Sequence, residues 1–428
     1  MADFIDSKGG TRVFKKSSLN GKITVYIGKR DYLERNDHID PIDGVVLIDP
    51  DYVKDRRVFV HVLAAFRYGR EDLDVLGLTF RKDLYLDYQQ LYPKIENENC
   101  DLDKQQDQSN SLTRLQARLM QKLGTNAYAF YFNLPRNSPA SVTLQPAPED
   151  VGKPCGVDYE LKVYVAKSFE DKTQKRSCVK LAIRKLTFAF NGPNIPPTDE
   201  IIKEFRLSSG KVIMDASLDK QTYFHGESIS VTVSVDNSST KTIKKIKLQV
   251  LQIADIMLFT RAVYKCVIDE VESEKFFPIN PGQTGWNVTF SMCPLLSNNR
   301  HKRGLALDGK LRHEDTNLAS STVVQSKDNI EDLGIIVSYK VRIKLILGFT
   351  SSDIQLELPF NLTHPNPEED LTVNTYDGLD IFKNSLTFTD NYEPISSQAE
   401  QDDDLIFVDF ARLKLDVKDF EENNNNNK

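Results

Sequence analysis

The feature that most constrains this fold is a two-residue alternation of apolar and polar side chains that recurs along most of the chain. Successive side chains of a strand point to opposite faces, so each alternating or β-branched run predicts a half-buried strand. Turn-forming pairs such as Asn20-Gly21 and His225-Gly226 separate the runs. Many short strands between such turns are typical of antiparallel β-sandwiches. The predicted strands are Lys22–Gly28, Gly44–Asp49, Arg57–Phe66, Val157–Val165, Cys178–Phe190, Ser228–Val235, Ile243–Val250, Trp286–Met292, Gly334–Gly348 and Ile354–Leu362.

The domain organisation follows from length and from a weak repeat. A chain of 428 residues exceeds what one hydrophobic core normally supports. The stretch Val157–Val163 resembles Val337–Ile343, which suggests two sandwiches of one type, and the Pro- and Gly-rich segment Asn191–Thr198 separates them. We therefore expect a sandwich at residues 1–195, a hinge at 196–205, a second sandwich at 206–367 and an acidic tail at 368–428 with a disordered end.

One segment, 111–124, has helical instead of strand periodicity. Its apolar residues recur every three or four positions, which places them on one face of a helix. Ser111 is the expected N-cap, and Gly124 is expected to follow the last helical residue. We expect a stripe of leucines to lie against a sheet: Leu112, Leu115 and Leu119.

The net charge of −7 conceals an asymmetry between the two ends of the chain. Residues 361–428 carry 16 Asp/Glu against 5 Lys/Arg, whereas residues 1–30 carry seven basic residues against two acidic ones. Two interpretations remain open: a solvated, disordered tail, which is common for such composition, or a tail that occupies a basic surface. The apolar island Asp402–Lys414 within the tail can dock somewhere.

The sequence does not support a disulfide-rich secreted protein or a membrane-spanning protein. The five cysteines (Cys100, Cys155, Cys178, Cys266 and Cys293) are odd in number and include no C-x-x-C pair, which favours a reducing cytosol over a disulfide framework. The longest apolar run, Val58–Phe66, is interrupted by His61, and no secretory signal is visible at the N-terminus.

Motifs for catalysis are also absent from the sequence. It contains no phosphate-binding Gly loop, no G-x-S-x-G and no H-E-x-x-H, and its six histidines are scattered. We therefore expect neither an enzyme nor a metal or cofactor site, although a Cys-His dyad between remote residues stays open. A pI near 5.6 argues against nucleic acid as the main partner.

Long motifs along the chain resemble the arrestin family, in its group of β-arrestins and visual arrestins, and most closely an invertebrate-type member. They are Gly10–Ser17, Gly28–Tyr32, Phe66–Leu84, Arg303–Ser320 and Phe407–Arg412. The resemblance implies an all-β fold of two tandem antiparallel β-sandwiches, one short amphipathic helix on the first, and a C-terminal tail docked through residues 404–413.

The resemblance also implies a function. An arrestin binds activated, phosphorylated G-protein-coupled receptors, blocks G-protein coupling, and can scaffold signalling and receptor endocytosis without being an enzyme. We would then expect a cytoplasmic protein that is recruited to the plasma membrane. The sequence leaves open whether the role is visual or non-visual, and a trafficking adaptor that binds cargo without a phosphate switch is the alternative.

Two contacts are expected to hold the resting state if the resemblance holds. The first is an interdomain cluster of charges whose matching positions are Asp31, Arg184, Asp308, Asp315 and Arg412. Removing one partner of a buried ion pair costs about 3–5 kcal/mol, so a phosphate competing for Arg184 would weaken the cluster. The second is an apolar contact of three elements: Val13, Phe14, Leu112, Leu115, Leu119, Ile406, Phe407 and Phe410. Without the resemblance, Arg184 would be an ordinary surface residue and the leucines ordinary core.

Receptor contacts are implied at two further sets of residues. Phosphates need cations at close range, and the candidates are Arg12, Lys15, Lys16, Arg30, Lys122 and Arg312, with solubilising charge as the plain alternative. A segment with mixed apolar and charged residues matches the finger loop that enters the receptor: Tyr68, Gly69, Arg70, Glu71, Asp72, Leu73, Asp74, Val75, Leu76, Gly77 and Leu78.

Two family sites are only partly preserved. The clathrin-adaptor motif resembles F-x-x-F-x-x-x-R, but here Phe407 and Phe410 are followed by Lys414, which keeps the charge and loses bidentate geometry. Leu405–Asp409 fits a clathrin box but overlaps the docking strand. A site for inositol phosphates or phosphoinositides on the second sandwich would use Lys247, Lys265, Arg342 and Lys344, although Leu251 stands where β-arrestins tend to have Arg.

Overall fold

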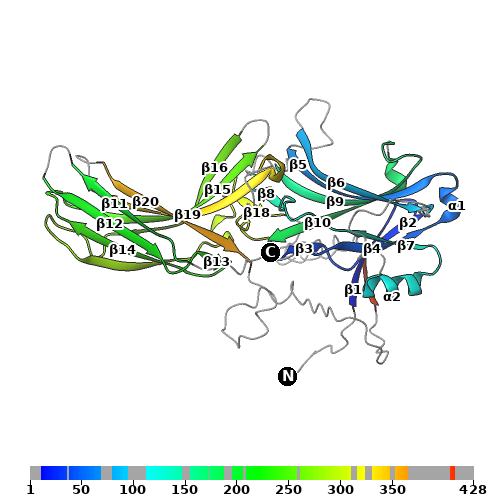
Figure 1. The fold of residues 1–428 in the computed structure, drawn as a ribbon, viewed down its shortest axis with the longest axis horizontal. Helices are drawn as coiled ribbons and strands as arrows, with labels where there is room; N and C mark the ends of the chain where they lie inside the picture. The colour runs from blue at the N-terminus through cyan, green and yellow to red at the C-terminus, as the bar shows by residue number, and fades with distance from the viewer. Residues whose placement is uncertain are drawn as a thin grey trace, which may run out of the picture.

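The computed structural model describes residues 11–35, 38–68, 80–94, 112–146, 155–171, 173–187, 195–205, 209–257, 261–309, 316–322, 330–347, 352–364 and 405–409. Its strands form two β-sandwiches that lie side by side along the long axis of the molecule (Figure 1). The predicted all-β class with two tandem sandwiches is confirmed. No described helix is both long and apolar enough to cross a membrane.

The first sandwich pairs a five-stranded with a seven-stranded sheet. The smaller sheet has the order β21 (Leu405–Asp409), β1 (Thr11–Ser17), β2 (Ile23–Ile27), β4 (Ile42–Ile48) and β7 (Ala127–Phe132). The larger sheet has the order β18 (Ala306–Asp308), β8 (Val142–Leu144), β9 (Cys155–Ala166), β10 (Cys178–Thr187) and β3 (Asp31–Glu34); β5 (Arg57–Tyr68) joins β9 to β6 (Phe80–Tyr92). The strands β18 and β21 come from the far end of the chain, so the first sandwich is completed by the second half of the sequence.

Short helices accompany this sandwich. Helix α1 (Pro50–Val53) is a single turn, and the 3₁₀ turn η3 (Lys175–Ser177) precedes β10. Helix α2 (Arg114–Leu123) lies below the five-stranded sheet, close to β1 and β21 (Figure 1).

The second sandwich has a four-stranded and a five-stranded sheet. The first has the order β11 (Thr198–Glu204), β12 (Lys211–Leu218), β14 (Ile229–Asn237) and β17 (Trp286–Met292). The second has the order β13 (Thr222–Phe224), β20 (Ile354–Thr363), β19 (Ile335–Ile346), β15 (Lys245–Met257) and β16 (Arg261–Ser273). The 3₁₀ turns η4 (Leu296–Asn299) and η5 (Ile330–Leu333) lie between strands.

The sheets are not wholly antiparallel. Strand β21 pairs parallel with β1, β3 with β10, and β13 with β20. Parallel neighbours need a long connection, and each of these pairs joins segments that are far apart in the sequence. The parallel pairs therefore mark where distant parts of the chain are brought together.

The predicted hinge differs from the structure over most of its length. Residues Thr198–Glu204 form β11, an edge strand that pairs antiparallel with β12. Prolines before it suggested a linker, but Ile201 packs against the core of the second sandwich. Its mostly exposed side chains gave no periodic signal for a strand.

Two apolar cores hold the sandwiches. One fills the first sandwich between its sheets and includes Val25, Phe130 and Leu161. The other fills the second sandwich and continues into the first, because buried residues of β5, β8 and β9 such as Phe66, Val142 and Val157 belong to the same cluster. This continuity joins the two sandwiches through apolar packing rather than through a bare linker.

A buried histidine stands apart from these cores. His61 on β5 is 8% exposed, and neither of its ring nitrogens has a hydrogen-bond partner among the described residues. It borders a surface cavity of about 470 Å³ whose lining includes Lys162 and Lys180. Burial, with the charges of Lys162, Lys180 and Arg81, lowers the pKa of His61 to about 4 despite the opposing charge of Asp83. The folded protein therefore resists protonation of this ring.

That resistance predicts acid sensitivity. The unfolded chain protonates His61 below its ordinary pKa, whereas the folded chain does so only near pH 4, so stability falls as the pH falls between these values. The expected loss is about 1.4 kcal/mol per pH unit across that window. Urea unfolding at several pH values should show that His61→Leu removes this part of the slope and that His301→Gln, at an exposed histidine, leaves it unchanged. An unaltered slope in His61→Leu would contradict the assignment.

Candidate functional site

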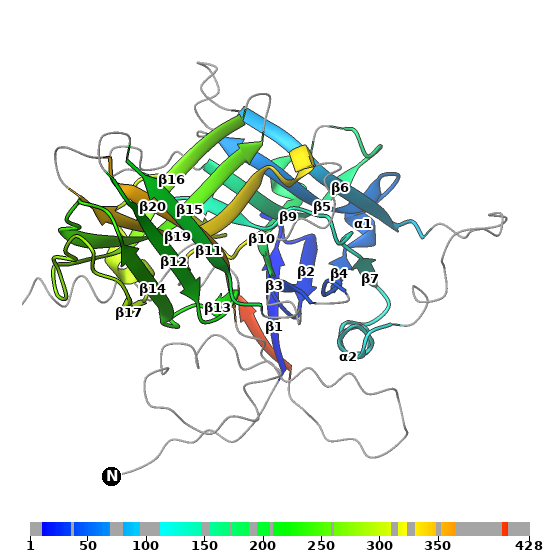
Figure 2. The same ribbon diagram turned by 60° about the vertical axis from the view of Figure 1, so that its left-hand side comes forward.

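The candidate site is organised around β1, which carries the tail strand on its outer edge. Strand β21, red in Figure 2, lies beside β1. The two strands run parallel, with Val13 opposite Phe407 and Arg12 opposite Ile406. Among the described residues β21 is the last strand of its sheet, and β1 is the one described strand that pairs with it. The docked C-terminal tail expected from the sequence is present over Leu405–Asp409.

An apolar cluster, here called the tail contact, holds β21 against β1 and α2. Its buried members are Val13, Tyr26, Val45, Leu119 and Ala127, and its half-buried members are Leu47, Leu115, Met120, Leu123, Leu405 and Phe407. The ring of Phe407 meets that of Tyr26 edge to face at 5.6 Å between centroids. Phe407 is thus the main anchor of the tail.

Helix α2 is seated on the sheet by polar contacts at its start. Its N-cap is Thr113, not the predicted Ser111, because Thr113 and Gln116 form a capping box. The Thr113 hydroxyl donates to Asp43 at 2.7 Å, and the Gln116 amide donates to the carbonyl of Phe130 at 2.8 Å. Gly124 follows the last helical residue, as predicted. These bonds fix the face of α2 that meets the tail.

The structure brings together only part of the residues expected in the three-element contact. Val13, Leu115, Leu119 and Phe407 lie in the tail contact. Three others lie outside it: Phe14 packs against the core of the first sandwich, and Leu112 and Ile406 are 48% and 49% exposed. Strand alternation turns Phe14 and Ile406 away from their neighbours, and Leu112 precedes the helix cap. Phe410 lies outside the described residues.

Two lysines flank the tail anchor. The ammonium of Lys122 on α2 lies 5.0 Å from the ring centroid of Phe407, and that of Lys15 on β1 lies 6.0 Å from it. Both cations therefore meet at the face of one aromatic ring, a modest attraction for an exposed pair. An anion that approaches them must also approach the ring.

The other cations expected to bind phosphate have different surroundings. Lys16 donates to the carbonyl of Lys180 at 2.6 Å, and Arg12 is exposed on β1. The guanidinium of Arg30 lies 4.9 Å from the Phe14 ring, and burial, with the charge of Arg184, lowers its pKa against the opposing charge of Asp31. Arg312 lies outside the described residues.

The second centre is the polar cluster, formed among the described residues by Arg184, Asp31 and Asp308. Arg184 donates two hydrogen bonds, of 2.7 and 2.6 Å, to the Asp31 carboxylate and a third, of 3.1 Å, to the carbonyl of Gly309. Burial opposes ionisation, but the hydrogen bond and charge of Asp31 and the charge of Asp308 raise the pKa of Arg184. Asp315 and Arg412, the remaining expected members, lie outside the described residues.

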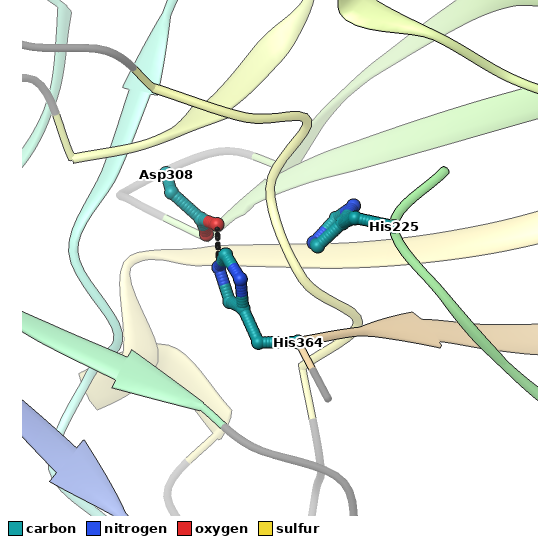
Figure 3. A group of neighbouring side chains, drawn as sticks. All are labelled: His225, Asp308 and His364. Atoms are coloured by element: carbon teal, nitrogen blue, oxygen red, sulfur yellow. Dashed lines mark hydrogen bonds and ion pairs between the residues drawn. The ribbon is translucent and has the colours of Figure 1, made fainter. Parts of the chain in front are cut away.

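Asp308, a member of the expected charge cluster, bonds directly to His364. Its Oδ2 lies 2.6 Å from Nε2 of His364, and its Oδ1 accepts from the backbone N–H of Ser320 at 3.1 Å. Burial raises its pKa, but the charge and hydrogen bond of His364, the charge of His225 and the Ser320 bond outweigh burial and lower it. Figure 3 shows His225 facing the same pair from a third segment.

Comparison with known proteins identifies the family to which this chain belongs. The family model for the arrestin (or S-antigen) N-terminal domain matches residues 23–189, and that for the arrestin C-terminal domain matches residues 208–367. This chain belongs to the arrestin family. Its members are non-enzymatic regulators and adaptors, which agrees with the expectation that the chain is not an enzyme.

Individual arrestins are similar over nearly the whole chain. Beta-arrestin arr-1 of Caenorhabditis elegans is 52% identical over 433 residues, covering 97% of this chain and 96% of the relative. Beta-arrestin-2 of Homo sapiens is 50% identical, covering 95% and 96%, and arrestin red cell isoform 2 of Oncorhynchus mykiss is 51% identical, covering 95% and 97%. The likeness to β-arrestins supports the family's role in desensitising G-protein-coupled receptors.

Sequence reasoning missed a buried ion pair beside the polar cluster of this arrestin. Lys185, 2% exposed, donates to Glu34 at 2.8 Å and to the carbonyl of Ser138 at 2.6 Å. Burial lowers the pKa of Lys185, and Glu34 opposes that shift. Alternation along β10 could have signalled it, since Lys185 occupies an inward position between Ile183 and Thr187.

The remaining family sites are placed only in part. Of the finger loop, Tyr68 at the end of β5 is described and Gly69–Leu78 is not. In the adaptor motif, Phe407 is covered by the tail contact, and Lys414 lies outside the described residues.

The expected inositol-phosphate residues lie on neighbouring strands of the second sandwich. Three of them are paired with acids: Lys247 with Glu270 at 2.7 Å, Arg342 with Glu357 at 2.9 Å and Lys344 with Asp353 at 2.8 Å. Lys265 is exposed on β16, and Leu251 is buried. An anion at this face would have to compete with three carboxylates.

The buried pair predicts a large cost of truncation. Lys185→Met strands the Glu34 carboxylate and should lower the free energy of unfolding by about 3–5 kcal/mol. Lys22→Met breaks an ion pair with Asp49 at the surface and should change it little. Adding Glu34→Gln to Lys185→Met should recover part of the loss. Chemical denaturation of the four proteins measures these effects, and equal stability of the two lysine variants would contradict the burial argument.

The tail contact predicts a matched pair of variants on β21. Phe407→Ala removes the half-buried anchor and should speed trypsin cleavage after Arg412 about tenfold, equivalent to about 1.4 kcal/mol of docking free energy. Ile406→Ala, one residue away and 49% exposed, should change the rate less than about twofold. Cleavage followed by mass spectrometry separates the two. Similar rates for both variants would show that Phe407 does not anchor the tail.

Proposed function

We propose that this arrestin binds activated, phosphorylated G-protein-coupled receptors, blocks their coupling to G proteins and is switched by receptor phosphate. The observation that carries the proposal is the anchor of the tail: Phe407 lies between β1 and α2 with Lys15 and Lys122 at its ring. The relatives that share half of the sequence are named beta-arrestins.

Competition between a phosphate and the tail follows from this arrangement. A phosphate that binds Lys15 and Lys122 in a charge-assisted way removes their attraction to the Phe407 ring and occupies space beside it. Within the described part of the chain the edge strand β21 pairs with β1 alone, so loss of its anchor releases it. Binding of phosphate and docking of the tail are therefore mutually exclusive in this proposal.

The polar cluster is the second part of the switch. A further phosphate near Arg184 competes with Asp31 for the guanidinium, and the half-buried Asp31 and the buried Asp308 would then lose their shared cation. Loss of the guanidinium would also break its bond to Gly309, which ties the segment after Asp308 to β10, and so would favour rearrangement between the sandwiches. We include in this proposal Asp315 and Arg412 as further members of the charge cluster and Arg312 as a further phosphate-binding cation.

The partners in endocytosis extend the proposal. Release of β21 would expose Phe407 for a clathrin adaptor and Leu405–Asp409 for clathrin, with the adaptor weakened by Lys414. The finger loop would enter the receptor, and Lys247, Lys265, Arg342 and Lys344 would hold an inositol phosphate. The protein would act in the cytoplasm and at the plasma membrane.

The test is trypsin cleavage after Arg412 in the full chain, with a multiply phosphorylated receptor-tail peptide that lacks Lys and Arg. The phosphopeptide should accelerate cleavage, and its unphosphorylated twin should not, because only phosphate competes at the lysines. The double variant Lys15→Gln/Lys122→Gln should need about tenfold more phosphopeptide for the same ratio of stimulated to basal rate.

The control is Lys211→Gln, which removes an exposed cation from the second sandwich and should respond as the wild type does. Fast cleavage that ignores the phosphopeptide would refute the switch. It would favour the alternative, an arrestin-like adaptor that binds cargo without a phosphate switch.

A further inference from the structure

Three side chains that are remote in sequence converge where the two sandwiches meet. His225 follows β13, Asp308 ends β18 and His364 follows β20 (Figure 3). One nitrogen or oxygen atom from each lies within 4.8 Å of the others. The scattered histidines of the sequence thus include two that the fold brings together beside a carboxylate.

The spacing of these atoms is close to that of a metal site. Zn²⁺ bound tetrahedrally at about 2.0–2.1 Å separates its ligand atoms by about 3.3 Å. Here the Asp308 carboxylate and the His364 ring are 2.6 Å apart, and the centroids of the two histidine rings are 4.6 Å apart. To complete the geometry, the first pair must open by about 0.7 Å and His225 must approach by up to about 1.5 Å.

The chemistry of the three groups also fits. Two imidazoles and one carboxylate suit Zn²⁺, and three protein ligands leave a fourth position on the metal. The Nε2 atom of His225 lies 3.5 Å from the Ser320 hydroxyl, a long contact that a metal ion can replace.

Surrounding bonds hold the ligands in place. Asp308 Oδ1 accepts from the Ser320 N–H at 3.1 Å, which leaves Oδ2 turned toward His364. The backbone N–H of His225 donates to the carbonyl of Thr363 at 3.1 Å, which ties the two histidine segments together. Arg184 bonds directly to Asp31 and Gly309, so the side chain that engages Oδ2 of Asp308 is His364, itself one of the three proposed ligands. Such outer contacts orient metal ligands.

We propose that His225, Asp308 and His364 form a Zn²⁺ site that fastens the second sandwich to the first. The two histidines adjoin β13 and β20, which pair at the edge of the second sandwich, whereas Asp308 belongs to β18 in the larger sheet of the first. A bound ion therefore bridges the sandwiches beside the polar cluster. It also draws the Asp308 charge toward itself and away from Arg184.

The experiment titrates the full chain, stripped with a chelator and dialysed, with Zn²⁺ in a calorimeter. One saturable equivalent is expected. His225→Gln and His364→Gln should each weaken it on the order of 100-fold, whereas His301→Gln, at an exposed histidine of the second sandwich, should leave it unchanged. Co²⁺ in place of Zn²⁺ should give a tetrahedral visible spectrum without a thiolate charge-transfer band, which distinguishes this site from the free cysteines.

Several outcomes would overturn the proposal. They are the absence of a saturable equivalent, an equal affinity in all three histidine variants, or a thiolate band in the cobalt spectrum. If the glutamine variants fail to fold, anomalous scattering from Zn²⁺-soaked crystals of the wild type decides: a peak between the three side chains supports the site, and no peak there refutes it.

Discussion

The bidentate pair between Arg184 and Asp31 is the interaction on which the rest of the candidate site depends. The two residues are also Cα partners in the parallel pairing of β10 with β3, so side chains and backbone specify the same register. The third bond of the guanidinium, to Gly309, fixes the segment that follows Asp308. A planar group with five donors can hold a carboxylate and a carbonyl at once, which a lysine cannot do in this geometry. One side chain thereby joins two strands of the first sandwich to a segment from the second half of the chain.

Strand β1 brings the polar cluster and the tail contact close together. The carbonyl of Arg30 accepts from the N–H of Arg184 at 2.8 Å. The guanidinium of Arg30 lies over the ring of Phe14 on β1. Val13 and Lys15, on either side of Phe14, face the tail instead. Because alternate residues of a strand face opposite sides, β1 presents one face toward the charges and the other toward Phe407. Phe14 therefore lies between the two centres instead of in the predicted apolar contact.

The sequence predicted the fold class well and the site in part, and the reasons are physical. Every predicted strand overlaps an observed one, because half-buried strands with one inward face carry a period-two signal. Strands β6 and β16 escaped prediction since both of their faces are largely half-buried or exposed, which blurs that signal.

Within the site, the resemblance located Val13, Phe407, Asp31 and Arg184 but could not tell which neighbouring residues face inward. The approach of His225 to His364, 139 positions later, depends on the parallel pairing of β13 with β20, and no local pattern encodes such a pairing. The N-cap moved from Ser111 to Thr113 because a capping box needs a partner three residues on, and Gln116 supplies it.

The magnitudes explain why the tail can be both docked and displaceable. Full burial of a phenylalanine or leucine side chain contributes about 1.5–3 kcal/mol, and Phe407 and Leu405 are only half-buried. Each cation over the Phe407 ring adds about 0.5–1 kcal/mol at an exposed site. Ordering five residues of β21 costs about 1–2 kcal/mol each, which matches or exceeds these gains, so the backbone hydrogen bonds to β1 are needed for docking and the net docking energy is small. A charge-assisted hydrogen bond contributes about 1.5–3 kcal/mol, so a few phosphate contacts match the net docking energy. The two centres therefore differ in kind: the tail contact is balanced closely enough for a ligand to tip, whereas the polar cluster is held by the bidentate pair of Arg184 with Asp31 and changes when that guanidinium is taken.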